Sequence, residues 1–188
     1  MYDLDIISVT YKQEHPLKCF VESILSQTKD SWKLHILHDG PGPDFIRIMN
    51  NYWGDPRINY FCTEERYNDY GHSLRKLGIK ELGNSRYTLI TNVDNYYTPV
   101  FLQEMCSYDT DVVYCQFVHS HWNYTTRPTE MGRGKIDCGC FIVKTDIVKE
   151  VGWNSTNYHA DWEFLQDCLK YNSKLSVRRV EKILFVHN

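Results

Sequence analysis

The sequence has no excess of basic residues and no long apolar run. Lys and Arg number 21 against 24 Asp and Glu in 188 residues, which gives a net charge of −3. Because a nucleic-acid backbone attracts a basic surface, this balance argues against nucleic acid as a partner. The apolar stretches are only a few residues long, so we expect no integral membrane segment.

The marks of a secreted protein are also missing. The first residues, MYDLDIISV, lack the basic and then apolar layout of a secretion signal. The seven cysteines form an odd set in mostly apolar contexts, which indicates reduced core thiols. We therefore expect a soluble, cytoplasmic protein in a reducing compartment, with one domain over residues 1–188.

Strand-like and helix-like segments alternate along the first sixty residues. The expected strands cover 5–11, 32–37 and 57–62, and the expected helices run from Pro16 to about Gln27 and over 45–53. This alternation predicts the α/β class, with a parallel sheet and right-handed crossovers.

The second half continues the pattern less regularly. The expected strands cover 87–91, 111–118 and 136–143, with one or two more over 175–186. The expected helices cover about 71–83, 99–106, 145–151 and 159–171. Residues 123–135 are rich in Thr, Pro, Gly and Arg without a period, which predicts a mobile loop near the functional site.

Polar residues end the strand at 87–91 abruptly. Asn92, Asp94 and Asn95 lie at its carboxyl end, where open α/β sheets bind ligands. Mg²⁺ and Mn²⁺ prefer oxygen ligands, so Asp94 with an amide oxygen of Asn92 or Asn95 is a candidate metal site. An ordinary turn is the competing interpretation, because Asp and Asn are common turn formers.

Seven short segments carry more information together than any one of them does. They are ISVTYK, VESILSQT, LHDG, GHSLRKLGI, TNVDNYYTP, IVKTDIVKEVGW and HADWEFL. In this order they resemble the family 2 glycosyltransferases, and the resemblance covers almost the whole chain. It implies the GT-A fold, a mixed, mainly parallel Rossmann-like sheet flanked by helices. It also implies transfer of a sugar from a nucleotide-diphosphate donor, a UDP-sugar being favoured, to an acceptor hydroxyl.

The resemblance assigns the nucleotide to residues 1–95 and a metal ion to the sheet edge. The implied nucleotide-binding residues are Thr10, Tyr11, Asp39, Arg75, Asn92 and Val93. Asp94 would be the main ligand of Mn²⁺ or Mg²⁺, and His187, near the carboxyl terminus, would join it. Asn92 and Asn95 replace acids that many relatives carry, which lowers the charge available to the metal.

The donor sugar and the acceptor are assigned to residues 96–188. The acceptor would be a glycan, a protein or a lipid-linked molecule. The candidate contacts are Asp137, Gly139, His119, His121 and Trp162. If His119 and His121 share one face of a strand they could also bind zinc, but no third ligand has an identifiable place.

Asp161 matches the catalytic base of the family, with Ala160 where relatives often carry Glu. The base would take the proton of the acceptor hydroxyl, and attack opposite the leaving diphosphate would invert the anomeric centre. A helix amino terminus lowers the pKa of a carboxylate, so we expect Asp161 to be ionised but weak as a base. Without the resemblance, a simple helix cap is the preferred interpretation.

Two other functions stay open. Asn92, Asn95 and Ala160 suit a non-catalytic GT-A-like module that binds a nucleotide or a partner. A nucleotidyltransferase shares carboxylates at strand ends, but it would usually carry a glycine-rich loop after the first strand. Residues 10–13, Thr-Tyr-Lys-Gln, contain no glycine, which argues against that function.

Overall fold

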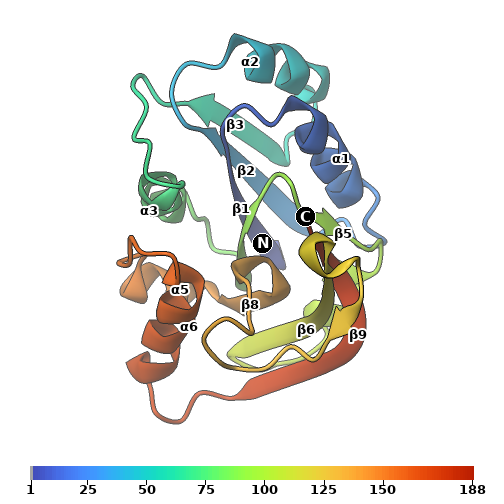
Figure 1. Ribbon diagram of the computed structural model, residues 1–188, viewed down its shortest axis with the longest axis vertical. Coiled ribbons are helices and arrows are strands. Elements are labelled where there is room, and N and C mark those ends of the chain that lie inside the picture. Colours follow the sequence, from blue (N-terminus) through green and yellow to red (C-terminus); the bar gives the residue numbers. More distant parts are fainter. Residues whose placement is uncertain (1) are drawn as a thin grey trace.

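The computed structural model describes residues 2–188, and a nine-stranded sheet runs through this part of the chain (Figure 1). The strand order is β3-β2-β1-β4-β8-β6-β9-β5, and β7 pairs with β6 outside this path. The strands are β1 (Leu4–Thr10), β2 (Trp32–His38), β3 (Ile58–Cys62), β4 (Tyr87–Asn92), β5 (Tyr96–Tyr97), β6 (Val112–His119), β7 (Thr126–Arg127), β8 (Phe141–Lys144) and β9 (Val177–His187).

The amino-terminal part of the sheet is parallel and the rest is mixed. β1 pairs in parallel with β2 and β4, and β2 pairs in parallel with β3. β8 is antiparallel to both β4 and β6, whereas β6 and β9 are parallel. All seven residues of β1 are buried, as expected for a central strand covered on both faces. This confirms the predicted α/β class with a mixed sheet.

Helices cover the two faces of the sheet. They are α1 (Glu14–Leu25), α2 (Pro43–Met49), α3 (His72–Lys80), α4 (Phe101–Met105), α5 (Thr145–Val151) and α6 (Ala160–Tyr171). Three short 3-10 helices add to these, η1 (Asn50–Tyr52), η2 (Ser120–Trp122) and η3 (Cys138–Cys140). Figure 1 shows α1 and α2 on one side of β1 and β2, and α3, α5 and α6 on the other. Within residues 2–188, no helix has the length and apolar character needed to cross a bilayer.

Several element boundaries differ from the sequence expectations. The strand expected over 136–143 is limited to β8, because Asp137 Oδ1 accepts a hydrogen bond from the Gly139 backbone N–H and folds 138–140 into η3. β5 and β7 lie in segments for which no strand was expected, and each has only two residues, too few to show a period. The end of the chain forms one eleven-residue strand, β9.

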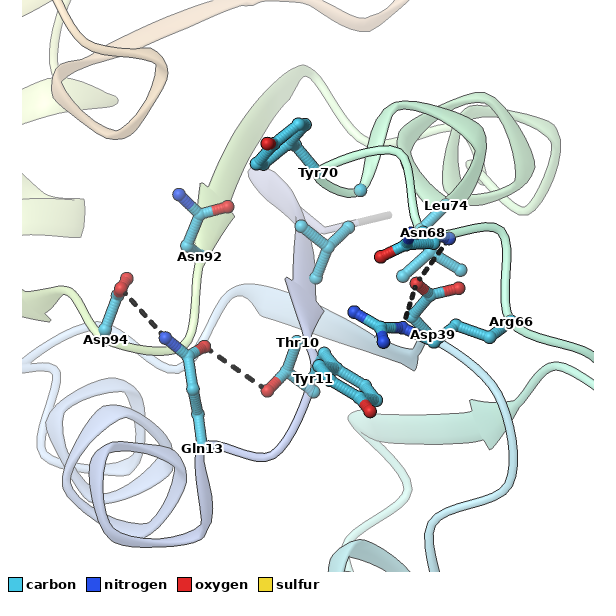
Figure 2. Close-up of a pocket in the computed structure, with 12 residues that line it drawn as sticks. Thr10, Tyr11, Gln13, Asp39, Arg66, Asn68, Tyr70, Leu74, Asn92 and Asp94 are labelled. Atoms are coloured by element: carbon cyan, nitrogen blue, oxygen red, sulfur yellow. Dashed lines mark hydrogen bonds and ion pairs between the residues drawn. The ribbon is translucent and has the colours of Figure 1, made fainter.

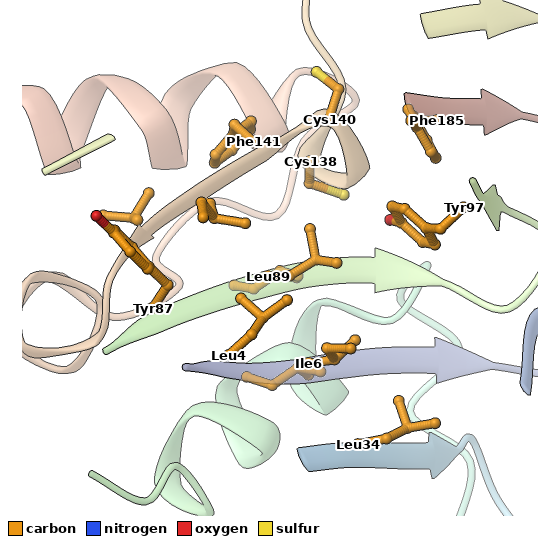
Figure 3. Close-up of a cluster of buried hydrophobic side chains, with 14 of the residues drawn as sticks. Leu4, Ile6, Leu34, Tyr87, Leu89, Tyr97, Cys138, Cys140, Phe141 and Phe185 are labelled. Carbon is orange, nitrogen blue, oxygen red and sulfur yellow. The ribbon is translucent and has the colours of Figure 1, made fainter. Parts of the chain in front are cut away.

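The hydrophobic core joins the two parts of the sheet. Leu4, Ile6 and Leu89 from β1 and β4 pack in one cluster with Tyr97 and Phe185, drawn from β5 and β9 (Figure 3). Five of the seven cysteines are buried in apolar surroundings, as expected for core thiols, whereas Cys19 is exposed and Cys62 is half-buried. The core therefore fixes the carboxyl ends of the strands, where the polar residues gather.

Candidate active site

The central strands end side by side and leave a pocket at their carboxyl ends. Thr10 of β1 is paired with His38 of β2, and Val9 is paired with Asn92 of β4. The pocket has a volume of about 490 Å³. Its lining residues are Val9, Thr10, Tyr11, Gln13, Asp39, Arg66, Asn68, Tyr70, Gly71, Leu74, Asn92 and Asp94. Figure 2 shows Asp39 and Arg66 on one side of this pocket and Gln13 and Asp94 on the other.

Asp39 connects the end of β2 to the segment before α3. Its carboxylate oxygens accept hydrogen bonds from the backbone N–H groups of Tyr67 at 2.8 Å and Asn68 at 3.0 Å. Arg66 lies 3.5 Å from Asp39 Oδ2 and places its guanidinium 3.5 Å from the centre of the Tyr11 ring. Asp39 therefore shapes the pocket wall, and its Oδ1, with one hydrogen bond to Tyr67, can accept a second.

Replacing Asp39 with Ala is expected to loosen this wall, because two backbone N–H groups lose their acceptors. Hydrogen exchange measured by NMR should then accelerate at Tyr67 and Asn68 by about tenfold or more, which corresponds to about 1.4 kcal/mol. Asp44→Ala on the exposed face of α2 is the control and should leave both rates unchanged. Equal exchange in the Asp39 variant and the wild type would show that other contacts hold the segment.

Asp94 occupies the opposite side of the pocket. Its Oδ2 accepts a hydrogen bond from Gln13 Nε2 at 3.0 Å, and among the described residues its buried Oδ1 has no partner. Burial raises the pKa of Asp94 above its ordinary value. A buried carboxylate oxygen without a partner is a suitable ligand for a cation.

The two amides expected beside Asp94 are engaged elsewhere. Asn92 Oδ1 accepts a hydrogen bond from Arg75 Nη2 at 2.7 Å. Asn95 is fully buried, and its Oδ1 accepts from the Asn188 backbone N–H at 3.4 Å while its Nδ2 donates to Thr91 at 3.2 Å. In this arrangement Asn95 supports the turn after β4 and does not offer a free oxygen to a metal.

Two of the expected nucleotide contacts lie away from the pocket wall. The Val93 side chain is fully buried in the core, which leaves only its backbone for a ligand. Arg75 is 5% exposed and lies behind the pocket, bonded to Asn92 and, through Nη1, to the Tyr70 carbonyl at 2.9 Å. Its guanidinium also lies 4.9 Å from the centre of the Trp153 ring.

His187 and Asp137 form an ion pair at the end of β9. His187 Nε2 lies 2.9 Å from Asp137 Oδ2. Burial alone would lower the pKa of His187, but the hydrogen bond and charge of Asp137 raise it above its ordinary value. Burial alone would likewise raise the pKa of Asp137, and the contact with His187 holds it below its ordinary value. Each side chain therefore stabilises the charged form of the other.

The two expected histidines lie beside this pair. The His119 ring stacks on His187 with the ring centres 4.1 Å apart. His121 belongs to η2 and not to a strand, so the two histidines do not share a strand face as expected. His119 Nδ1 accepts a hydrogen bond from the His121 backbone N–H at 3.0 Å, which occupies one of the nitrogens that zinc would need. Trp162 is half-buried against the hydrophobic core.

Gly139 is required by close packing. A Cβ at this position would lie 2.6 Å from the Phe185 ring and 3.0 Å from the Tyr97 hydroxyl, while its N–H donates to Asp137 at 2.7 Å. Gly139→Ala is therefore expected to lower the free energy of unfolding by about 1–3 kcal/mol, measured by urea denaturation. Gly132→Ala, where the nearest atom is 3.7 Å away, is the control. Equal losses in the two variants would contradict the packing argument.

Asp161 lies near the start of α6 and bonds to a different segment. Its Oδ2 accepts a hydrogen bond from the Cys138 backbone N–H at 3.3 Å, and α6 has no side-chain cap, so the helix-cap interpretation is wrong. Burial and the charge of Asp137 raise the pKa of Asp161 to about 6. The expected lowering by the helix terminus is therefore reversed, and Asp161 is a stronger base than the sequence predicted.

One more group of potential ligands lies at this place. Ligand atoms of Asp137, Cys138 and Asp161 all lie within 4.8 Å of one another. Burial raises the pKa of the Cys138 thiol well above its ordinary value, so this sulfur stays protonated. A hard cation such as Mn²⁺ would find only the carboxylate oxygens useful here.

The sequence did not single out seven residues of the pocket wall. Four of these have polar side chains, namely Gln13, Arg66, Asn68 and Tyr70. Gln13 comes three residues after the end of β1. Because ligands bind at the carboxyl ends of such strands, its place in the sequence could have indicated a contact with the pocket. The other three polar residues belong to a polar segment that reaches the pocket only through its bonds to Asp39, a contact 28 and 29 residues away in the sequence.

A pocket at the carboxyl ends of parallel strands, with a base candidate on a later helix, is the arrangement of a GT-A glycosyltransferase. Residues 5–173 match the model of glycosyl transferase family 2. The chain therefore belongs to glycosyl transferase family 2. No protein with a curated description matches the sequence.

Solved structures share this fold at low sequence identity. The 1–349 segment of S. aureus TarS aligns with 100% of the chain at 13% identity and a TM-score of 0.82. The same segment in complex with UDP-GlcNAc aligns with 99% of the chain at 14% identity and a TM-score of 0.80. The mannosyltransferase PcManGT from Pyrobaculum calidifontis, in complex with GDP-Man and Mn²⁺, aligns with 98% at 11% identity and a TM-score of 0.74. The chain spans 56 to 60% of these three structures.

Proposed function

We propose that this chain is an inverting glycosyltransferase that uses a UDP-sugar and a divalent cation. The observation that carries the proposal is a row of ionisable side chains that begins at the pocket. Asp94 lines the pocket, His187 lies 2.9 Å from Asp137, and ligand atoms of Asp137 and Asp161 lie within 4.8 Å of each other. This row joins the pocket at the strand ends to the base candidate, as transfer between a donor and an acceptor requires.

The nucleotide is assigned to residues 1–95 and the sugar chemistry to residues 96–188. All twelve residues that line the first pocket come from the first of these halves. Tyr11 lies under two cations, with Arg66 at 3.5 Å and Lys12 at 5.3 Å from its ring centre, and Asp39 offers acceptor oxygens beside them. An aromatic ring and acceptors suit a base and ribose, and the cations suit a diphosphate. The UDP-GlcNAc complex of the TarS segment supports a UDP-sugar as the donor.

Asp94 and His187 have the atoms needed to hold the cation. Asp94 Oδ1 and His187 Nδ1 are both buried, and neither has a hydrogen-bond partner within residues 2–188. Carboxylate oxygen and imidazole nitrogen suit Mn²⁺, the ion in the PcManGT complex, and the ion would take the place of the proton on His187 Nδ1 while Nε2 keeps its contact with Asp137. When bound, the ion would supply positive charge for the departing diphosphate.

Asp161 would take the proton of the acceptor hydroxyl. Its pKa of about 6 keeps it largely ionised at neutral pH and makes it more basic than an exposed carboxylate. Asp137 holds its own charge close by through the pair with His187, which sustains the raised pKa of Asp161. Gly139 sets the orientation of Asp137 through its N–H. Attack on the face opposite the diphosphate would invert the anomeric centre.

The proposal is tested by the release of nucleoside diphosphate from UDP-GlcNAc and GDP-mannose with Mn²⁺ present. We expect UDP to be released from UDP-GlcNAc, at a low rate when no acceptor is present. Removal of Mn²⁺ with a chelator should reduce the rate further. Boiled protein and the Asp161→Asn variant control for spontaneous hydrolysis. If UDP binds but no donor is turned over with any acceptor, the non-catalytic binding module replaces the transferase.

A further inference from the structure

A second pocket lies beside Asp161. It has a volume of about 390 Å³ and is lined by Tyr70, His72, Arg75, Thr156, Asn157, Tyr158, Ala160 and Asp161. Tyr70 also lines the first pocket, and Arg75 bonds to Asn92 of that pocket, so the two cavities share a wall. A molecule in the second pocket would therefore lie next to the donor site and within reach of the base candidate.

Two exposed tyrosines flank this second pocket. Tyr70 is 93% exposed and Tyr158 is 96% exposed, although large aromatic rings usually gain by burial. Tyr70 has a φ of 58°, a left-handed conformation that bulky residues rarely adopt. The bond from Arg75 Nη1 to the Tyr70 carbonyl, 2.9 Å long, supports this conformation. Strain of this kind persists where the surrounding structure maintains it, often at binding sites.

The segment that carries Tyr158 is also held in place. Asn157 Nδ2 donates to both carboxylate oxygens of Glu163 at 2.8 Å, and Asn157 Oδ1 accepts from the His159 backbone N–H at 2.7 Å. These bonds connect the segment to the first turn of α6, which also carries Asp161. Tyr158 and the base candidate are therefore positioned by the same helix end.

Polar groups complete the wall between the two rings. His72 Nδ1 accepts a hydrogen bond from Trp153 Nε1 at 3.1 Å, so the neutral ring carries its proton on Nε2 and can donate it. Arg75 is 5% exposed, and its Nε has no partner among the described residues. Thr156 adds a hydroxyl. The lining of the cavity therefore combines hydrogen-bonding groups with two tyrosine rings.

We propose that the second pocket binds the acceptor and that the acceptor is a saccharide. A pyranose ring has two C–H faces and a rim of hydroxyls, which match flanking tyrosines and a polar wall. One ring hydroxyl would face Asp161, while Tyr70 and Tyr158 lie against the C–H faces. A lipid chain would offer no acceptor to the buried Arg75 Nε, which has no partner among the described residues, and this cost argues against it. The inference rests on the transferase function proposed above.

Saturation-transfer NMR tests this inference without any turnover. The probes are the methyl glycosides of glucose, N-acetylglucosamine, galactose and mannose, each added to the full chain with UDP and Mn²⁺. We expect saturation transfer to the ring C–H protons of at least one glycoside. Tyr158→Ala should weaken its binding by about three- to tenfold and leave UDP binding unchanged, as one aromatic contact implies.

Tyr171→Ala is the matched control, because Tyr171 is an exposed tyrosine at the far end of α6 and is 55% exposed. It should bind the glycoside as the wild type does. Equal binding by the two tyrosine variants overturns the assignment of Tyr158. If UDP binds but none of the glycosides binds, the saccharide acceptor is overturned and the proposed function is left intact. If neither UDP nor any glycoside binds, the saccharide acceptor and the transferase function are overturned together.

Discussion

Replacing Asp161 with Asn is expected to reduce sugar transfer by about 10² to 10⁴ and to stabilise the folded protein at neutral pH. The amide keeps the size of the side chain and can still accept the Cys138 N–H, but it cannot take a proton. In the wild type, transfer should rise with pH through about 6 as Asp161 loses its proton. Initial rates with UDP-GlcNAc and an acceptor, measured over a range of pH, check both statements.

The stability effect follows from the sign of the pKa shift. Because the pKa of Asp161 is about 6 in the folded chain and lower in the unfolded chain, the folded state loses stability as pH rises through 6. The Asn variant avoids this loss, so it should gain on the order of 1–3 kcal/mol at pH 7.5 and nothing below about pH 4. Urea denaturation at both pH values measures the difference. Asp167→Asn, farther along α6, is the control, and an equal gain there would refute the burial argument.

Replacing Asp94 with Asn is expected to abolish the dependence of nucleotide binding on Mn²⁺. The substitution removes the charge but keeps the shape, so Gln13 Nε2 retains an acceptor. The affinity for Mn²⁺ in the presence of UDP should fall by about tenfold to a hundredfold. Electron paramagnetic resonance of the free and bound ion measures this change. Asp44→Asn, on the exposed side of α2, controls for a general change in charge. Unchanged Mn²⁺ binding would instead favour the carboxylates of Asp137 and Asp161 as the ligands.

The sequence predicted the parts of the fold that depend on local pattern. Alternating strands and helices predicted the parallel strands β1, β2 and β3, because buried strands and amphipathic helices have distinct periods. The position of Asp94 after β4 followed from the break between apolar and polar residues. Asp161 needed the family resemblance, since its own sequence context favours a helix cap.

The parts that depend on distant contacts were missed. Nothing near Asp137 in the sequence indicates that it pairs with His187, 50 residues later and at the end of a different strand. The raised pKa of Asp161 comes from burial and from Asp137, which only the folded chain brings close. The amide of Asn95 was expected to face a metal, but it bonds to the backbone of Asn188, which joins it only through the pairing of β5 with β9.

Calorimetric titration of UDP, in the presence and absence of Mn²⁺, tests the central claim most directly. The claim is that the pocket at the ends of β1, β2 and β4 is a donor site completed by a cation. We expect tight binding of UDP with Mn²⁺ and much weaker binding without it, with GDP weaker than UDP in both conditions. Absence of UDP and GDP binding in both conditions would contradict the account of this chain as a nucleotide-sugar transferase.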